Sequence, residues 1–284
     1  MKFDPRTILV CAALALLPAT LAAAADASPK TGSLQAAAED DASLMKTGVD
    51  LLYAKNNPAE AAAAFRKVLE HEPAHYGATY QLATALERSG RKKESSQAWE
   101  KTLELAEKYN DENSAEAARS RLPGYPVVIV ETSLGNFKMR VNAKRAPATA
   151  ENFLRLVDEK FYDGTIFHRI MPGFMIQGGG RGPDGAEKKI PHPPLKFEVT
   201  GIHNRRGAVA MARTNDPDSA NAQFFVNTVD NLWLDHAEGR PGYAAFGAVI
   251  EGMDVVDKIK AVQVNAGAYP IQPPIIKSIR RDRP

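Results

Sequence analysis

Two different spacings of apolar residues divide this chain. Over residues 42–122, apolar side chains recur three or four positions apart, which is the spacing of an amphipathic helix. Within residues 123–284 the spacing becomes two, as in Phe137, Met139 and Val141, which is typical of a strand with one buried face. The pattern therefore predicts a helical region followed by a β-rich domain.

The helical region contains an internal repeat. A shift of 34 residues places Leu52 on Leu86 and Phe65 on Trp99. A helix–turn–helix period of that length resembles the tetratricopeptide repeat, here in two copies, with residues 112–121 expected as a capping helix. Two interpretations stay open at this point: a pair of helical hairpins docked on the second domain, or a concave surface that binds a protein partner.

The β-rich region alternates short apolar segments with Gly, Pro and Asp. A helix is expected to begin at Pro147, because proline suits the first helical position. Many short strands with only two helices favour a closed antiparallel barrel with helical plugs. The strands are expected over residues 127–130, 137–141, 165–170, 174–177, 207–212, 223–228, 244–249 and 275–279, and the second helix over 252–260.

The N-terminus has the charged, apolar and small-residue order of a secretory signal peptide. Lys2 and Arg6 precede an uncharged run that Pro18 interrupts, and four alanines precede Asp26. We expect residues 1–25 to be a signal that is removed, residues 26–41 to be a flexible leader, and the mature protein to be periplasmic or secreted without stable membrane insertion. An uncleaved membrane anchor is the alternative, since the run is close to the ~20 residues of a spanning helix.

Charge and cysteine content narrow the possible functions. The 284 residues include 36 Lys and Arg against 34 Asp and Glu, and so balanced a chain is not expected to bind nucleic acid. The single cysteine, Cys11, lies in the segment expected to be removed. This excludes an internal disulfide and a cysteine-based metal site or nucleophile in the mature chain.

Two short motifs match known sites but lack the required context. The pattern H-E-x-x-H ends at His75, but Pro73 stands inside it and would break the helix that has to carry both histidines. The glycines at 180, 182 and 185 match G-x-G-x-x-G. The prolines that follow exclude the helix whose amides would hold a phosphate. We interpret both as loops.

The candidate chemistry lies in residues 162–247. Simple alternation places Phe167 and Arg169 on one face of a strand and His168 on the other. One interpretation makes the apolar members barrel core and Arg169 a solvated charge. The other is a single groove lined by alternate side chains, namely Arg169, Met175, Gln177, Gln223 and Phe225.

These segments resemble the cyclophilin family of peptidyl-prolyl cis/trans isomerases, or rotamases, most closely its bacterial periplasmic branch. The resemblance covers residues 126–284 and rests on Tyr162–Arg169, Pro172–Gly179, Met211–Arg213, Gln223–Phe225, Trp233–Asp235 and Tyr243–Gly247. It implies a closed eight-stranded antiparallel β-barrel capped by two helices. Matched residue by residue, it implies Arg169 as the catalytic residue and a substrate site formed by Phe174, Met175, Gln177, Ala212, Arg213, Gln223, Phe225, Trp233, Leu234 and Tyr243.

Two positions depart from the pattern of the family's animal members. Arg213 stands where asparagine is usual and Tyr243 where histidine is usual, a pair of changes that bacterial members often share. Phe174 and Met175 are adjacent, so both can line one groove only if the chain bends after Gly173.

The resemblance implies a reaction without a covalent intermediate, metal or cofactor, and proline-containing polypeptides as substrates. The leading hypothesis is therefore an exported isomerase that assists protein folding. The alternative is a chaperone or scaffold in which the helical repeats bind clients and isomerisation is secondary.

Overall fold

The computed structural model describes residues 31–282. The chain divides into two compact units, and the boundary in the sequence lies between Leu122 and Pro123. The expected signal peptide, residues 1–25, lies outside the described residues. The prediction of a flexible leader over residues 26–41 is wrong from Thr31 onward, where helix α2 begins. The reason is local: residues 36–38 are consecutive alanines, the strongest helix formers.

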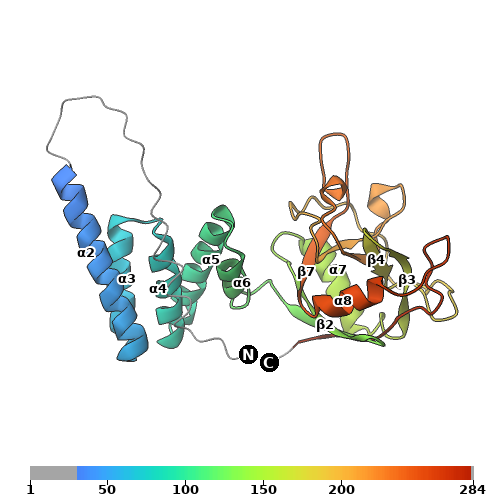
Figure 1. Ribbon diagram of the computed structural model, residues 1–284, viewed down its shortest axis with the longest axis horizontal. Helices are drawn as coiled ribbons and strands as arrows, with labels where there is room; N and C mark the ends of the chain where they lie inside the picture. Colours follow the sequence, from blue (N-terminus) through green and yellow to red (C-terminus); the bar gives the residue numbers. More distant parts are fainter. Residues whose placement is uncertain (1–30, 283–284) are drawn as a thin grey trace. The chain divides into compact units, whose positions relative to one another are not determined.

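The first unit consists of antiparallel helices that lie side by side in chain order (Figure 1). Positions related by the 34-residue shift are both buried: Leu52 with Leu86, and Phe65 with Trp99. Among residues 31–282, no helix combines the length and apolar character that crossing a bilayer requires. The helices are α2 (Thr31–Val49), continued by a π-helical turn (Asp50–Ala54), α3 (Pro58–His71), α4 (Tyr76–Arg88), α5 (Lys92–Lys108) and α6 (Glu112–Arg119).

The H-E-x-x-H segment falls at a break between two helices, as expected. His71 ends α3, whereas His75 caps α4 by accepting a hydrogen bond from the amide of Ala78 at 3.1 Å. The two histidines therefore do not share a helix face. Within the part of the chain that the structure describes, no group of three His, Cys, Asp or Glu side chains is placed to hold a metal ion.

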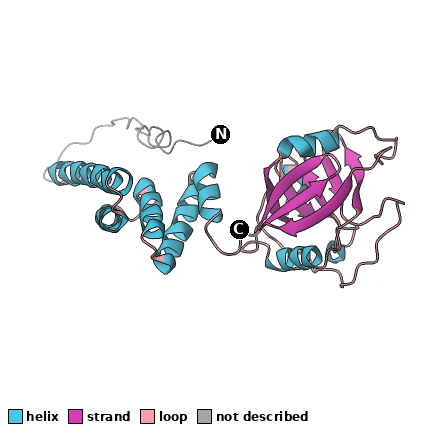
Figure 2. Cartoon of the chain, turned by 90° about the horizontal axis from the view of Figure 1, so that it is seen from below, coloured by secondary structure: helices cyan, strands magenta, loops and turns pink. Residues whose placement is uncertain are grey.

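The second unit is a closed barrel of eight strands in the order β1-β2-β7-β5-β6-β4-β3-β8, with every neighbouring pair antiparallel. This confirms the predicted fold, and helices lie on both sides of the curled sheet (Figure 2). The strands are β1 (Val127–Thr132), β2 (Gly135–Val141), β3 (Thr165–Met171), β4 (Met175–Gly178), β5 (Ala208–Met211), β6 (Phe224–Asn227), β7 (Ala245–Glu251) and β8 (Ile275–Arg281).

Two helices close the barrel core. Helices α7 (Pro147–Asp158) and α8 (Met253–Lys260) turn buried apolar side chains, among them Phe153 and Val256, into the core formed by the inward faces of the strands. Phe153 contacts three aromatic rings, those of Tyr162, Phe224 and Phe246, with centroids 5.0–5.9 Å apart. The interior of the barrel is thus filled by side chains, and a substrate site has to lie on the outside.

Strand β3 differs from the predicted alternation. Phe167 pairs with Gly178 but Arg169 pairs with the adjacent Gln177, so a β-bulge inserts one extra residue at His168. A bulge re-aims the side chains that follow it. The prediction that Phe167 and Arg169 share a face is therefore wrong, because Phe167 is buried in the barrel core while Arg169 is exposed.

Candidate active site

A row of paired residues crosses the outer face of the barrel. Arg169 of β3 pairs with Gln177 of β4, Gln177 with Phe225 of β6, and Phe225 with Ala210 of β5. Paired residues in neighbouring antiparallel strands project on the same side of a sheet. The fold thus places a permanently charged arginine, a glutamine and an aromatic ring in line across three strands.

An apolar cluster separate from the barrel core forms the floor of this region. Its buried members are Met175, Ala210, Phe225, Leu234 and Ala245. Half-buried side chains border them, namely Met171, Phe174, Ile202, Ala212 and Tyr243. We call these ten residues the groove cluster. An apolar surface on the outside of a filled barrel is suited to bind an apolar ring such as that of proline.

Two aromatic contacts shape the borders of the groove cluster. Phe174 stacks on Trp233, with ring centroids 5.3 Å apart and planes tilted by 21°. Gly173 has φ = +75°, which provides the predicted bend and lets both Phe174 and Met175 join the cluster. Trp233 is 59% exposed, so its indole is accessible to a ligand. On another border, the ring of Tyr243 meets Phe225 edge to face at 5.7 Å.

Arg169 is held by weak neutral partners. Its Nη1 donates to Oε1 of Gln177 at 3.4 Å and its Nη2 contacts Sδ of Met171 at 3.1 Å. Among residues 31–282, no carboxylate lies within ion-pair distance of the Arg169 guanidinium. Its charge and most of its N–H groups therefore remain available to a ligand.

A pair of glutamine amides lies beside Arg169. Nε2 of Gln177 donates to Oε1 of Gln223 at 2.9 Å, which fixes the orientation of both amides. His168 is buried behind Gln223, and burial, followed by the charge of Arg181, lowers the pKa of His168. The histidine is therefore neutral at pH 7, and it adds no charge next to Arg169.

The eleven residues implied by the resemblance form one continuous set of contacts or strand pairs. The set runs from Arg169 through the two glutamines to Phe225, and the groove cluster supplies Phe174, Met175, Ala212, Leu234 and Tyr243. Trp233 joins through Phe174, and Arg213 joins because its guanidinium carbon lies 4.5 Å from the centre of the Tyr243 ring.

Sequence reasoning missed a buried amide network under this site. Asn231 Nδ2 donates to the carbonyl oxygen of Phe174 at 3.0 Å and to Oδ1 of Asn227 at 2.8 Å. Asn227 Nδ2 donates to Asn204 Oδ1, and Asn204 Nδ2 donates to the carbonyl oxygen of Tyr243 at 3.2 Å. The network thereby links the loops that carry two borders of the groove cluster. Asn227 and Asn231 are close in the sequence, but Asn204 and the two carbonyl groups that the network holds lie 23–57 residues away from their partners, so no local pattern pointed to the network.

Asp235 anchors the same network. Burial alone would raise the pKa of its carboxyl, but hydrogen bonds from the backbone and side chain of Asn204 and from His203 hold that pKa below its usual range. An ionised Asp235 fixes the loop just after Leu234. The sequence does show a carboxylate directly after Trp233 and Leu234. Its hydrogen-bond partners, Asn204 and His203, lie 31 and 32 residues away and could not be identified from residue spacing.

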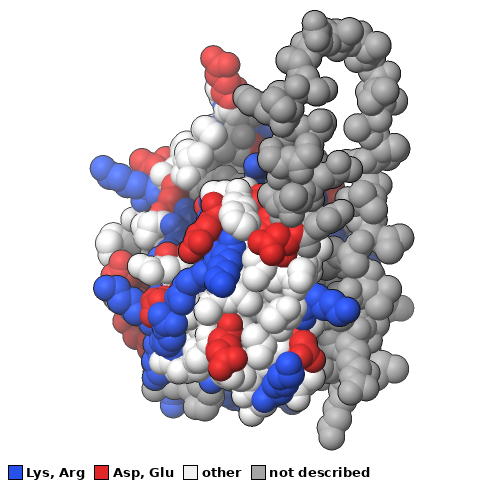
Figure 3. All heavy atoms as spheres, turned by 90° about the vertical axis from the view of Figure 1, so that its left-hand side faces the viewer, with Lys and Arg blue, Asp and Glu red and all other residues white. Residues whose placement is uncertain are grey.

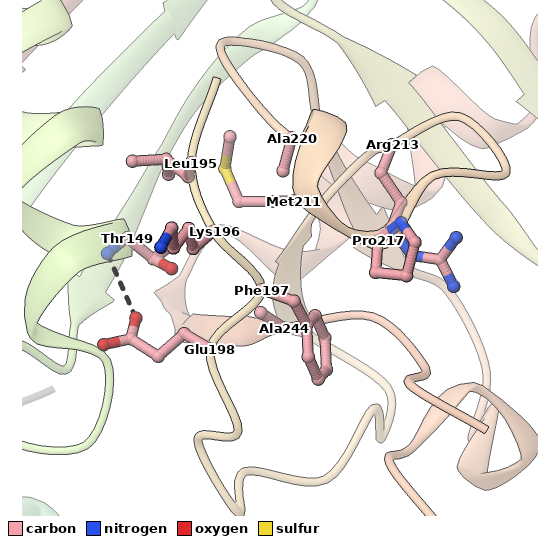
Figure 4. Close-up of a pocket in the computed structure, with 10 residues that line it drawn as sticks. All are labelled: Thr149, Leu195, Lys196, Phe197, Glu198, Met211, Arg213, Pro217, Ala220 and Ala244. Carbon is pink, nitrogen blue, oxygen red and sulfur yellow. Dashed lines mark hydrogen bonds between the residues drawn. The ribbon is translucent and has the colours of Figure 1, made fainter. Parts of the chain in front are cut away.

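A small hollow lies next to the groove (Figure 4). Its walls come from the loop that includes Leu195 and Phe197, from Pro217 and Ala220, and from the start of α7 at Thr149. Arg213 is the residue that it shares with the implied substrate site.

Comparison with known proteins identifies a family for each of the two units. The family model described as cyclophilin type peptidyl-prolyl cis-trans isomerase/CLD matches residues 127–281, and a tetratricopeptide repeat model matches residues 52–122. Peptidyl-prolyl cis-trans isomerase A of Dickeya dadantii is 46% identical over 158 residues, which cover 54% of this chain and 83% of the relative. Peptidyl-prolyl cis-trans isomerase B of Escherichia coli is 48% identical over 141 residues, 48% of this chain and 85% of the relative.

A solved structure shows the same relationship. The crystal structure of a Cryptosporidium parvum cyclophilin type peptidyl-prolyl cis-trans isomerase superposes with a TM-score of 0.51 at 28% identity, covering 56% of this chain and 99% of that one. Since the first family model matches more than half of the chain, the protein belongs to the cyclophilin-type peptidyl-prolyl cis-trans isomerase family. It combines this isomerase domain with N-terminal tetratricopeptide repeats.

Proposed function

We propose that this chain is an exported peptidyl-prolyl cis/trans isomerase in which Arg169 stabilises the twisted X–Pro bond. The observation that carries the proposal is the row formed by Arg169, Gln177 and Phe225 on the outer face of the barrel. It places a cation, which has no ion-pair partner among residues 31–282, next to an apolar floor. The cation complements the lone pair on a twisted proline nitrogen, and the floor complements the apolar proline ring.

The chemistry follows from the amide bond. Resonance holds an X–Pro bond planar behind a barrier of about 18–20 kcal/mol. A quarter turn breaks the resonance, and the proline nitrogen regains a lone pair that accepts a hydrogen bond. The Arg169 guanidinium is always charged and always a donor. Its bond to that nitrogen exists only in the twisted state, so it lowers the barrier rather than merely binding the substrate.

The groove cluster supplies the remaining requirements of the reaction. Phe225, Met175 and Leu234 are buried and make a preformed apolar seat for the proline ring. The amide of Gln177, fixed by Gln223, is placed to hold a neighbouring peptide group. A crystal structure of the parasite relative was obtained in the presence of the dipeptide Ala-Pro, which supports a proline peptide as the substrate here.

We propose further that the protein acts in folding outside the cytoplasm, in the periplasm or after secretion. The support is the N-terminal order of Lys2 and Arg6, an apolar run and four alanines, which is typical of an export signal. Fractionation of cells that express the full chain tests this. The expected result is a mature form shortened by about 25 residues in the exported fraction. Full-length protein retained in the membrane would instead support the anchor.

The helical unit is proposed to bind protein clients. Two of its tyrosines are about half exposed, Tyr53 at 43% and Tyr109 at 55%, and exposed aromatic rings are enriched where proteins meet. On the face seen in Figure 3, basic and acidic side chains interleave rather than forming a patch of one sign, which suits a protein partner better than a nucleic acid. A chaperone role in which binding dominates is the alternative function.

One experiment separates the two functions. Refolding of a test protein whose slow step is proline isomerisation is followed with catalytic amounts of the full chain, and exchange between cis and trans forms is measured by NMR on a short X–Pro peptide. An isomerase accelerates both reactions. Suppressed aggregation without faster exchange in the short peptide would overturn the proposed activity and favour the chaperone.

A further inference from the structure

Arg213 is a cation fixed in place at the edge of the groove. It follows β5, and its guanidinium donates from Nε to the carbonyl oxygen of Gly242 at 2.9 Å and from Nη1 to that of Thr214 at 2.8 Å. The same group stacks over the ring of Tyr243 at 4.5 Å. Three contacts thus orient the guanidinium, while the Nη2 amino group has no partner among the residues that the structure describes.

The charge of Arg213 has no counter-ion in the described part of the chain. Glu198, which lines the same hollow, accepts bonds from the amides of Ala148 and Thr149 at 3.1 Å instead, and it lies across the hollow from Arg213 in Figure 4. Asp218 likewise accepts from the amide of Phe197 at 2.8 Å. Both carboxylates accept hydrogen bonds from backbone amides, and neither forms an ion pair with Arg213.

Arg213 lies within reach of a peptide bound in the groove. The ring of Tyr243 touches Phe225, which is the paired neighbour of Gln177. The ring centroids of Phe225 and Tyr243 are 5.7 Å apart, and the guanidinium carbon of Arg213 lies 4.5 Å from the Tyr243 centroid. The two distances added together are no longer than about three residues of extended chain. A proline seated over Phe225 therefore brings one of its flanking residues to Arg213.

We propose that Arg213 makes this isomerase select substrates with an acidic side chain within about three residues of the X–Pro bond. This inference rests on the proposed function and adds a substrate class to it. An oriented guanidinium with a free amino group loses little further conformational entropy when it binds a carboxylate, because its conformation is already restricted.

The test compares matched pairs of peptides as substrates of the full-length protein. Glutamate and glutamine are placed in turn at each position up to three residues before and after the X–Pro pair, and kcat/KM is measured by NMR exchange. At one or more positions the glutamate peptide is expected to exceed the glutamine peptide about threefold, which is the range of a solvent-exposed ion pair. The ratio should fall toward one at high salt, which screens exposed charges.

Variants assign the preference to one side chain. Arg213→Gln is expected to bring the ratio of glutamate to glutamine peptides to about one, and Arg213→Lys to an intermediate value, because lysine keeps the charge without the planar fork. Lys277→Gln, which removes an exposed charge on β8, is the matched control and should keep the wild-type ratio.

Three results would overturn the inference. A wild-type enzyme that isomerises all these peptides equally would refute the acidic preference and leave the proposed function standing. A preference that Arg213→Gln does not alter would assign it to another group. If no peptide is isomerised at all, the proposed function fails, and the substrate preference fails with it.

Discussion

Gln177 and Gln223 form an amide pair that sets the polar edge of the groove, with Nε2 of Gln177 donating to Oε1 of Gln223 at 2.9 Å. Gly180 makes room for this pair. A Cβ atom added at Gly180 would stand 2.3 Å from Cγ of Gln223, a distance that no side chain tolerates. The position of one glutamine thus depends on the absence of a side chain three residues after the other.

We therefore expect Gly180→Ala to displace Gln223 and break the amide pair. Loss of one hydrogen bond of this kind predicts a fall in kcat/KM of about two- to tenfold, with little change in the thermal midpoint. The matched control is Gly182→Ala, whose added Cβ would meet only the exposed carboxylate of Asp184. Full activity in Gly180→Ala would show that the pair is not part of the catalytic site.

His168 predicts a pH dependence of stability. Its pKa in the folded protein lies below the ordinary 6.5 because it is buried. Below pH 6.5 the histidine of the unfolded chain binds a proton that the folded chain excludes. The contribution of His168 to the free energy of unfolding is therefore complete above pH 6.5, and it is lost as the pH falls from 6.5 through the lower pKa of the folded state. Calorimetry at pH 7, 6 and 5 should show a smaller fall in the barrel's unfolding temperature for His168→Gln than for the wild type. Equal falls would show that His168 accepts its proton in the folded state.

Catalysis is expected to reside in the second unit alone. Every residue of the implied site lies between Arg169 and Tyr243, and the barrel has a closed sheet and its own core. Deletion of residues 26–122 should therefore leave activity on a short X–Pro peptide nearly unchanged. Loss of most activity, while circular dichroism still reports a folded barrel, would mean that the helical repeats complete the site.

The sequence predicted the barrel better than the local geometry of the candidate site. The alternation of Phe137, Met139 and Val141 was a reliable guide because β2 pairs with β1 in a continuous register, the bulge in its pairing with β7 adds its residue to β7, and all three side chains are buried. At Arg169 the same rule failed, since one extra residue in β3 reverses the faces. A bulge is set by pairing with a neighbouring strand, and that pairing is not encoded in local alternation.

Long-range contacts explain what the sequence did not reveal. The network of Asn204, Asn227 and Asn231 reaches Phe174 and Tyr243 through bonds between residues 23–57 positions apart, which only the folded barrel brings together. The sequence likewise did not reveal that the charge of Arg213 is unpaired in the described chain, because this depends on Glu198 and Asp218 accepting hydrogen bonds from backbone amides instead. The repeat that relates Phe65 to Trp99, by contrast, could be predicted from the sequence, because both residues are buried core positions of neighbouring helical hairpins.

Replacement of Arg169 tests the central claim most directly. Arg169 is exposed and has no ion-pair partner in the described chain, so Arg169→Ala should change the thermal midpoint little. A charged hydrogen bond supplies about 1.5–3 kcal/mol, so kcat/KM on an X–Pro peptide should fall at least about tenfold. Arg169→Lys should recover little of the loss. The control Arg205→Ala, at another exposed arginine of the same unit, should retain wild-type turnover. A folded Arg169→Ala protein with full turnover would contradict the proposed role of Arg169.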